Sequence, residues 1–377
     1  MKVSCLQENL ARGLSIVQRA VATRSTLPVL SNVLVATEDG RLRLSATNLE
    51  LGITCWIGAK IEEEGSTTVP ARTFVDLVNT LPSDKVEMEL TVRTQSLNVR
   101  CGPFNNDIKC IDAQEFPPQP SPDVDEGLTL SVEDLREMIA QVAFAASNDD
   151  ARPVLTGVLM EVSDGEMTMA AADGFRLSVR SAHLSSPSGG SVSAIIPSRA
   201  LTELARVLSD GEETVTMVLP QDRGQVIFRG RDVELVSQII EGAYPDYKSI
   251  IPNGFSTRTV VSANSFLKAC KAADIFAREA AHSARVRVIP GGKLEPGRLE
   301  ISATAAETGS NETVVDATVE GEPVEIAFNV RFLVEVLSVI DTPNVALETS
   351  TASSPGVVRP VGREDFLHVV MPMHLGR

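Results

Sequence analysis

The sequence has few aromatic residues and an excess of acidic side chains. Phe, Trp and Tyr make up 4% of the 377 residues, so no base-stacking surface of the kind that binds single-stranded nucleic acid is evident. The formal net charge of −16 weighs against a nucleic-acid partner, because affinity for a polyanion comes from Lys and Arg. A surface that binds DNA would therefore have to be a local concentration of basic residues.

Catalytic and metal-binding signatures are also missing. The sequence contains no GxSxG, GxxxxGK[ST] or GxGxxG motif. The adjacent Asp149 and Asp150 could suggest a metal site, but no carboxylates follow at EF-hand spacing, and a solvated pair is the favoured interpretation. We therefore expect no enzyme active site, no cofactor and no metal. The histidines also lack metal-ligand spacing; they are His183, His282, His368 and His374.

Disulfide, secretion and membrane signals are absent as well. The N-terminus runs from Met1 directly into a polar helical pattern, unlike a signal peptide, and no apolar run approaches the ~20 residues of a membrane span. We expect a soluble cytoplasmic protein with no membrane partner. An odd number of cysteines without CxxC spacing favours free buried thiols. These are Cys5, Cys55, Cys101, Cys110 and Cys270.

The sequence does contain a long internal repeat. Its template is residues 153–179, where apolar and polar residues alternate around Val158 and the turn residues Ser163-Asp164-Gly165 follow, a pattern typical of a β-hairpin. Weaker copies begin at Pro28 and near Ala284. Their corresponding alanines are 125 and 132 residues apart: Ala46, Ala171 and Ala303.

A period of this length is the size of a whole domain. It predicts three similar domains, at residues 1–120, 127–246 and 253–377. Each is expected to be α+β, with two helices against antiparallel sheets, and such sheets leave exposed edges that favour pairing between chains. Linkers are predicted at the proline-rich 116–122 and at 241–252. Helical periodicity predicts helices at residues 9–20, 72–80, 131–147, 198–209, 263–277 and 330–340.

Four motifs, in their order and spacing, carry a resemblance to a known family. They are residues 171–177 (AADGFRL), 241–247 (EGAYPDY), 328–331 (FNVR) and 369–375 (VVMPMHL). On these motifs the chain resembles the beta subunit of bacterial DNA polymerase III, the beta sliding clamp, over its whole length. The resemblance implies a head-to-tail dimer of the clamp fold, a ring that encircles duplex DNA and tethers polymerases for processive synthesis. It implies no bound cofactor and no catalytic step.

The resemblance also offers an answer to the acidic charge. The predicted helices contain nine basic and seven acidic residues, so they carry +2 and the rest of the chain −18. A ring lined by helices could then have a mildly basic bore that makes weak contacts with DNA, independent of base sequence. For any single basic residue, solvated surface charge is the alternative interpretation. The predicted DNA contacts are Arg24, Arg72, Arg152, Arg199, Lys268 and Lys271.

A second implied site is a cleft between domains two and three, in which a clamp loader, the DNA polymerase III alpha subunit and other polymerases dock a short apolar peptide. The apolar C-terminal segment 369–373 has to cover something, and methionine side chains suit a shared site. Arg176 is expected at the rim and Pro245 at the floor. Leu155 and Leu177 could instead close an interdomain core. The predicted set is Leu155, Ala172, Gly174, Phe175, Arg176, Leu177, Pro245, Asn329, Phe332, Val369, Val370, Met371, Pro372, Met373 and Leu375.

The dimer is predicted to pair an edge strand of domain one with an edge strand of domain three. Ile108, Ile275 and Phe276 are the expected interface residues, with core packing as the alternative. Two rival functions stay open: a three-repeat scaffold that binds peptides but not DNA, and an enzyme with an unrecognised site. The chain departs from the family pattern at Ala172, at His374 and in the terminal Gly376-Arg377, which affects the rim of the cleft rather than the fold.

Overall fold

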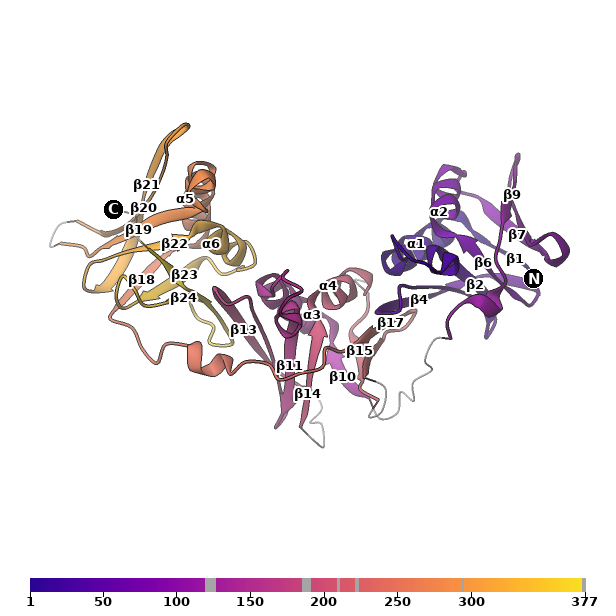
Figure 1. Cartoon of the computed structure of the whole chain (residues 1–377), viewed down its shortest axis with the longest axis horizontal. Helices are drawn as coiled ribbons and strands as arrows, with labels where there is room; N and C mark the ends of the chain where they lie inside the picture. Colours follow the sequence, from indigo (N-terminus) through magenta and orange to yellow (C-terminus); the bar gives the residue numbers. More distant parts are fainter. Residues whose placement is uncertain (119–126, 185–190, 209–210, 221–223, 293–294, 375–377) are drawn as a thin grey trace. The chain divides into compact units, whose positions relative to one another are not determined.

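The structure, a computed structural model, describes residues 1–118, 127–184, 191–208, 211–220, 224–292 and 295–374 (Figure 1). The predicted cleft residue Leu375 and the linker residues 119–122 lie outside the described residues. Helices and antiparallel strands alternate along the chain, which confirms the predicted α+β class. The helices are α1 Gln7–Val17, α2 Ala71–Thr80, α3 Val132–Val142, α4 Ser198–Val207, α5 Ala263–Ala277 and α6 Val330–Leu337.

The largest differences from the predicted helix ranges are at the ends of α1, α3 and α6. The helical turns after α1 and α3 tighten to 3-10 geometry, at Gln18–Ala20 and Ala143–Ala145, as is common at helix termini. α1 also begins two residues earlier than predicted and so includes Glu8. The helix starting at Val330 ends at Leu337 rather than at residue 340.

The described residues form two compact units, Met1–Glu133 with Glu203–Ile239 and Asp134–Thr202 with Ile240–Arg377. In the first unit the sheets have the orders β5-β1-β7-β8-β9 and β10-β15-β16-β17-β4-β3-β2-β6. Its strands are β1 Lys2–Leu6, β2 Asn32–Glu38, β3 Arg41–Thr47, β4 Leu51–Gly58, β5 Lys60–Glu63, β6 Ser66–Pro70, β7 Lys85–Thr91, β8 Ser96–Cys101, β9 Phe104–Lys109, β10 Leu128–Ser131, β15 Thr214–Val218, β16 Gln225–Arg229 and β17 Val233–Gln238.

The second unit contains one long sheet, in the order β14-β11-β12-β13-β25-β24-β23-β18-β21-β20-β19-β22-β26. Its strands are β11 Gly157–Ser163, β12 Glu166–Ala172, β13 Arg176–His183, β14 Val192–Pro197, β18 Thr257–Ser262, β19 Ser283–Ile289, β20 Gly297–Ala305, β21 Gly309–Gly321, β22 Val324–Asn329, β23 Asn344–Thr349, β24 Gly356–Pro360, β25 Phe366–Val370 and β26 Pro372–Met373.

The internal repeat is reproduced in the strand boundaries. β11, β12 and β13 each begin and end 125 residues after β2, β3 and β4. Both hairpin turns place an Asp-Gly pair at positive φ, Asp39-Gly40 in the first copy and Asp164-Gly165 in the second, as the turn residues predicted.

Backbone pairing also continues from one copy of the repeat to the next. β17 pairs with β4, and β25 pairs in the same way with β13. Each compact unit therefore contains one terminal copy together with the part of the middle copy that shares its sheet.

Helices pack closely on these sheets. In α1 the buried face includes Leu10 and Leu14, and a Cβ placed on Gly13 would lie 2.8 Å from Leu44 Cδ1 of β3, so glycine permits this close approach. In the second unit, Phe266 of α5 and Phe328 of β22 are fully buried in a second core. No helix among the described residues is long and apolar enough to cross a membrane.

Candidate functional site

The two faces of strand β13 have different environments, one apolar and one polar, because successive side chains of a strand point to opposite faces. Leu177 and Val179 lie on one face, within an apolar cluster. Arg176, Ser178 and Arg180 lie on the other, among polar and charged partners. The alternation thus gives β13 one apolar face and one face with polar and charged partners.

The apolar side, which we call the junction cluster, contains predicted cleft residues from strands far apart in sequence. Ala172, Leu177 and Val369 are all buried within it. Leu155 is also buried, in the 3-10 turn Pro153–Thr156 that precedes β11. The buried members of the junction cluster are Leu159, Ala170, Ala172, Leu177, Ile195, Tyr247, Val357 and Val369.

Sequence reasoning missed the two tyrosines of this cluster. Tyr247 is buried in it, and Tyr244 packs against it and accepts a hydrogen bond from the Ala172 N–H, 2.9 Å away, through its hydroxyl. Burial raises the pKa of Tyr244 to about 12. Pro245, expected at the floor, is exposed. The sequence did contain a signal for the two tyrosines, because the chain has only two and both lie in the linker at 241–252.

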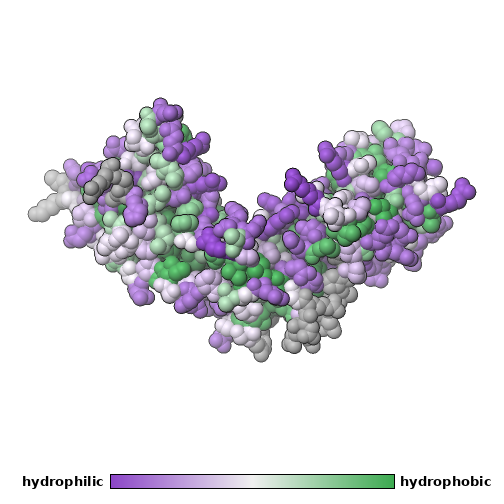
Figure 2. Space-filling view, in the orientation of Figure 1, coloured by the Kyte–Doolittle hydropathy of each residue, from purple (hydrophilic) through white to green (hydrophobic). Residues whose placement is uncertain are grey.

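Exposed apolar side chains border the junction cluster. Phe175 is 62% exposed and Met371 is 37% exposed. The Met371 N–H donates to the Phe175 carbonyl over 2.8 Å, one step beyond the Arg176–Val370 pair of β13 and β25. Figure 2 shows that apolar patches occur on a mainly polar surface in the face that it displays. These two side chains therefore stand together, over a buried apolar base.

The C-terminal segment is held on both sides of Met371. Before it, Val369 and Val370 belong to β25 and are buried. After it, Pro372 and Met373 form β26, which pairs with Ala327 and Phe328 of β22. The apolar end of the described chain is thus ordered by backbone pairing, rather than frayed.

Arg176 was predicted at the rim of the cleft, and this expectation is wrong. The residue is 9% exposed, because strand alternation turns its side chain away from Leu177. Its Nε donates to Asp173 Oδ2 at 3.0 Å, and its guanidinium forms an ion pair with Glu335. The guanidinium carbon lies 4.4 Å from the centre of the Phe332 ring. Arg176 is therefore fully engaged inside the protein.

Two further residues of the predicted cleft belong to this polar side or to helix capping. Phe332 packs beneath Arg176. Asn329 Oδ1 accepts the Arg331 N–H at 3.1 Å and caps the start of α6. Both support the fold around β13.

The polar side continues in an arginine–carboxylate network around Arg180, which is 3% exposed. Arg180 Nη2 lies 3.1 Å from Glu137 Oε2, and Arg180 also pairs with Asp365. Arg363 binds the same carboxylates, at 2.6 Å from Glu137 and 3.2 Å from Asp365. Hydrogen bonds from Arg363 and Arg180 lower the pKa of Glu137. The network joins α3, β13 and the start of β25.

His368 is the other titratable group behind β13. Its Nδ1 is 2.6 Å from Ser178 Oγ, and its ring stacks on Phe144 with 5.5 Å between ring centres. Complete burial, with a smaller effect of the Arg176 charge, lowers the pKa of His368 to about 3. The imidazole is therefore neutral near pH 7.

The six predicted DNA contacts are all exposed. Arg72 Nε lies 3.9 Å from Asp76, and Arg152 Nε lies 3.3 Å from Asp149. Within the described ranges, Arg24, Arg199, Lys268 and Lys271 form no ion pair. Arg152 also lies beside Gly174, because a Cβ on Gly174 would come within 3.2 Å of its Nη1. Gly174 belongs to the predicted peptide site, so Arg152 lies next to a residue of that predicted site.

The charge of the helices is slightly lower than predicted. The six α-helices and the 3-10 turn Gln18–Ala20 carry nine basic and eight acidic residues, because α1 includes Glu8. Four of the acids are paired with arginines of the same unit: Asp76 with Arg72, Glu137 with Arg180 and Arg363, Glu203 with Arg19 and Arg206, and Glu335 with Arg176 and Arg331. Several of these arginines are themselves helix residues, so the helices as a group stay close to neutral.

The dimer prediction requires an unpaired strand edge in domain one and another in domain three, and both domains have one. β9 is the last strand of its sheet. The first part of β21, Gly309–Asp316, pairs with β20 alone, whereas β18 pairs only with residues 317–321. Ile275 is 57% exposed and Phe276 packs partly on the core, but Ile108 is only 6% exposed and offers little surface.

Comparison with known proteins decides the family. Models of the N-terminal, central and C-terminal domains of the DNA polymerase III beta subunit match residues 1–120, 129–246 and 248–374. The chain is 35% identical to the beta sliding clamp of Synechococcus elongatus, over 100% of both chains. This chain belongs to the DNA polymerase III beta subunit family, the beta sliding clamps. Membership makes it a sliding clamp, a processivity factor with no catalytic activity of its own.

Other sliding clamps agree in sequence and in structure. The clamp of Bacillus subtilis is 30% identical over 99% of both chains, and its crystal structure superposes with a TM-score of 0.93 at 28% identity over 100% of both chains. The clamp of Pseudomonas aeruginosa gives a TM-score of 0.89 at 30% identity, again over 100% of both chains. The predicted three-domain clamp fold is thus confirmed.

Proposed function

We propose that this clamp acts inside the cell as a head-to-tail homodimer that encircles duplex DNA. The observation that supports the dimer is the pair of open edges, β9 in the first unit and Gly309–Asp316 of β21 in the second. Unpaired backbone groups of an edge strand favour pairing with another chain. Ile275 lies exposed in α5, and Phe104 of β9 is also exposed. We take the domains as residues 1–120, 127–246 and 253–377.

The DNA contacts are proposed to be weak and independent of base sequence. Arg24, Arg72, Arg199, Lys268 and Lys271 have exposed charges that can approach phosphates. Near-neutral helices within a chain of net charge −16 would hold DNA by enclosure, with few lasting ion pairs. Such a surface permits sliding.

The junction cluster is the proposed docking site for a short apolar peptide of the DNA polymerase III alpha subunit, other polymerases and the clamp loader. Phe175 and Met371 would close on apolar side chains of the peptide, over the base formed by Leu177 and Val369. Arg152 takes the role expected of Arg176, because it is exposed beside Gly174 and can bind a carbonyl or carboxylate.

Two measurements test this function. Sedimentation should give the mass of a dimer, and the clamp loaded onto nicked circular DNA should stay bound until the circle is linearised. Retention should show no preference for base sequence. A protein that never leaves the monomer, or that binds circular and linear DNA equally, would fit the peptide-binding scaffold instead. Peptide docking is measured separately, with a fluorescent QLxLF-like peptide.

A further inference from the structure

The exposed Phe175 is carried by the turn that joins β12 to β13. Asp173 closes this turn with one carboxylate oxygen, because its Oδ1 accepts the N–H of Phe175 at 2.8 Å and that of Arg176 at 3.0 Å. Gly174 between them has a φ of 94°, in the left-handed region. The Phe175 carbonyl accepts the Met371 N–H at 2.8 Å. Hydrogen bonds therefore fix the backbone on both sides of the Phe175 side chain.

The first copy of the internal repeat contains the same turn, 125 residues earlier, at residues 48–50. Asn48 Oδ1 accepts the N–H of Glu50 at 3.0 Å and that of Leu51 at 2.8 Å. The Glu50 carbonyl accepts the Gln238 N–H at 2.9 Å, as the Phe175 carbonyl accepts from β25. A side-chain oxygen of Asn or Asp therefore closes the turn in both copies.

The side-chain cap forms this turn even where glycine is missing. At the position of Gly174 the first copy has Leu49, with a φ of 78°. Leucine is sterically disfavoured in this left-handed conformation. The turn nevertheless forms around the cap from Asn48, so the cap, and not only the glycine, selects the conformation.

The first copy has additional support that the second copy lacks. Thr47 Oγ1 accepts the Leu49 N–H at 3.0 Å and donates to the Leu51 carbonyl at 3.1 Å. Ala172 occupies the position of Thr47 and has no hydroxyl. The turn of the second copy therefore depends more strongly on Asp173.

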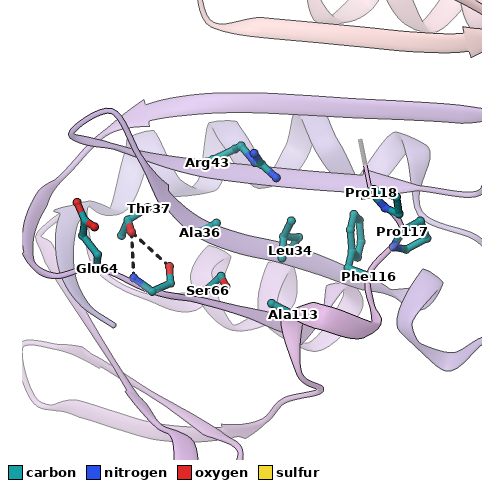
Figure 3. A pocket seen from close by; sticks show the side chains of 11 residues that line it. Leu34, Ala36, Thr37, Arg43, Glu64, Ser66, Ala113, Phe116, Pro117 and Pro118 are labelled. Atoms are coloured by element: carbon teal, nitrogen blue, oxygen red, sulfur yellow. Dashed lines mark hydrogen bonds between the residues drawn. The ribbon is translucent and has the colours of Figure 1, made fainter. Parts of the chain in front are cut away.

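The two copies differ in what the turn carries. Leu34 in the first copy corresponds to Leu159 of the junction cluster. Phe116, from the segment after β9, packs with Leu34 in one buried cluster (Figure 3), so the chain itself covers this apolar base. The turn of the first copy carries the charged Glu50, whereas the turn of the second copy presents Phe175.

We propose that Asp173 is a positioning residue for peptide docking and that it acts through Phe175. This inference rests on the proposed docking site. The cap holds the turn in one conformation, with Phe175 beside Met371, so the peptide does not have to order it. Asp173 need not touch the peptide, because both carboxylate oxygens are bound inside the protein, with Oδ2 accepting from Arg176 Nε at 3.0 Å.

The test measures the affinity of the full-length chain for the fluorescent QLxLF-like peptide. Asp173→Ala should weaken binding about fivefold, because the hydrogen bonds that order the turn are lost. Asp173→Asn should stay within about twofold of the wild type, since Asn48 shows that an amide oxygen accepts the same two N–H groups. Adding Asp173→Ala to Phe175→Ala should weaken binding no further, because the effect of Asp173 is transmitted through Phe175.

Asn48→Ala is the matched control, because it removes the corresponding cap from the other compact unit. It should leave peptide affinity unchanged. Hydrogen exchange at the Phe175 and Arg176 amides reports on the turn without any peptide, and Asp173→Ala should speed it.

The positioning role is overturned if the wild type binds and Asp173→Ala binds equally well, or if Asp173→Asn loses as much affinity as Asp173→Ala. It is also overturned if Asn48→Ala weakens binding as much, or if Asp173→Ala still weakens binding in the Phe175→Ala background. A wild-type chain that does not bind the peptide would instead overturn the docking site itself, even if amide exchange still responded to Asp173→Ala.

Discussion

At the scale of single residues, the fold depends on charges held behind β13. Arg180 and Arg363 share the carboxylates of Glu137 and Asp365 in a partly buried group. Removing one partner of a buried ion pair leaves the other charge uncompensated, which typically costs about 3–5 kcal/mol. Because Arg363 still contacts both carboxylates, part of that cost is relieved.

Arg180→Met is therefore expected to lower the free energy of unfolding by about 2–4 kcal/mol. Urea unfolding followed by circular dichroism measures the change. Arg72→Met is the matched control, because the Arg72 side chain is 96% exposed and its pair with Asp76 is long. That variant should stay within about 0.5 kcal/mol of the wild type. An equal effect of the two substitutions would contradict a supporting role for the network.

His368 predicts how stability depends on pH. Its pKa in the folded chain is about 3, against about 6.5 when unfolded, so between these two pH values the unfolded chain binds this proton and the folded chain does not. Stability from this group is present above pH 6.5 and is lost as the pH falls, by about 1.4 kcal/mol per pH unit. In His368→Phe this slope should disappear between pH 6.5 and 4.5, whereas in the exposed His183→Asn it should remain. Unfolding at several pH values measures both.

At the scale of elements, the junction cluster combines a buried base with two exposed side chains. Changing the base would damage the fold, so the exposed pair gives the cleaner test. Phe175→Ala and Met371→Ala should each weaken binding of the QLxLF-like peptide about tenfold or more, because each removes an apolar contact worth about 1.5–3 kcal/mol. Fluorescence polarisation measures the affinity.

Phe255→Ala is the control for these variants, since Phe255 is an exposed aromatic outside the junction cluster. It should leave peptide affinity unchanged. Deleting residues 371–377 should also abolish binding, but it removes β26 and so tests the segment less selectively. If the point variants bound the peptide as tightly as the wild type, the docking site would have to lie elsewhere.

Local sequence patterns predicted the positions of helices and strands well. They did not predict which side chains far apart in the sequence contact each other. Turn residues and the alternation around Val158 gave strand positions, because both signals act over a few residues. The side chain of Arg176 could not be placed in the same way, because its partners Phe144 and Glu335 are 32 and 159 residues away. The pair of Arg363 with Glu137 spans 226 residues. No spacing rule predicts such contacts.

At the scale of the whole molecule, the dimer prediction now depends on Ile275 more than on Ile108. Ile275→Asp should raise the dimer dissociation constant about a hundredfold or more, because an apolar contact is lost and a charge loses solvent. Analytical ultracentrifugation measures it. Phe255→Asp is the control and should leave the dimer intact. A dimer that is unchanged by Ile275→Asp would remove α5 from the interface.

Because β17 pairs with β4, the first two domains are held together by a shared sheet as well as by the covalent linker between them. A protease cut placed between Pro118 and Gly127 should leave the fragments associated, since five backbone-paired positions and the salt bridge between Arg41 and Asp232 hold them together. The cut chain should elute as one species and separate only in denaturant. Cutting this linker would therefore not open the proposed ring.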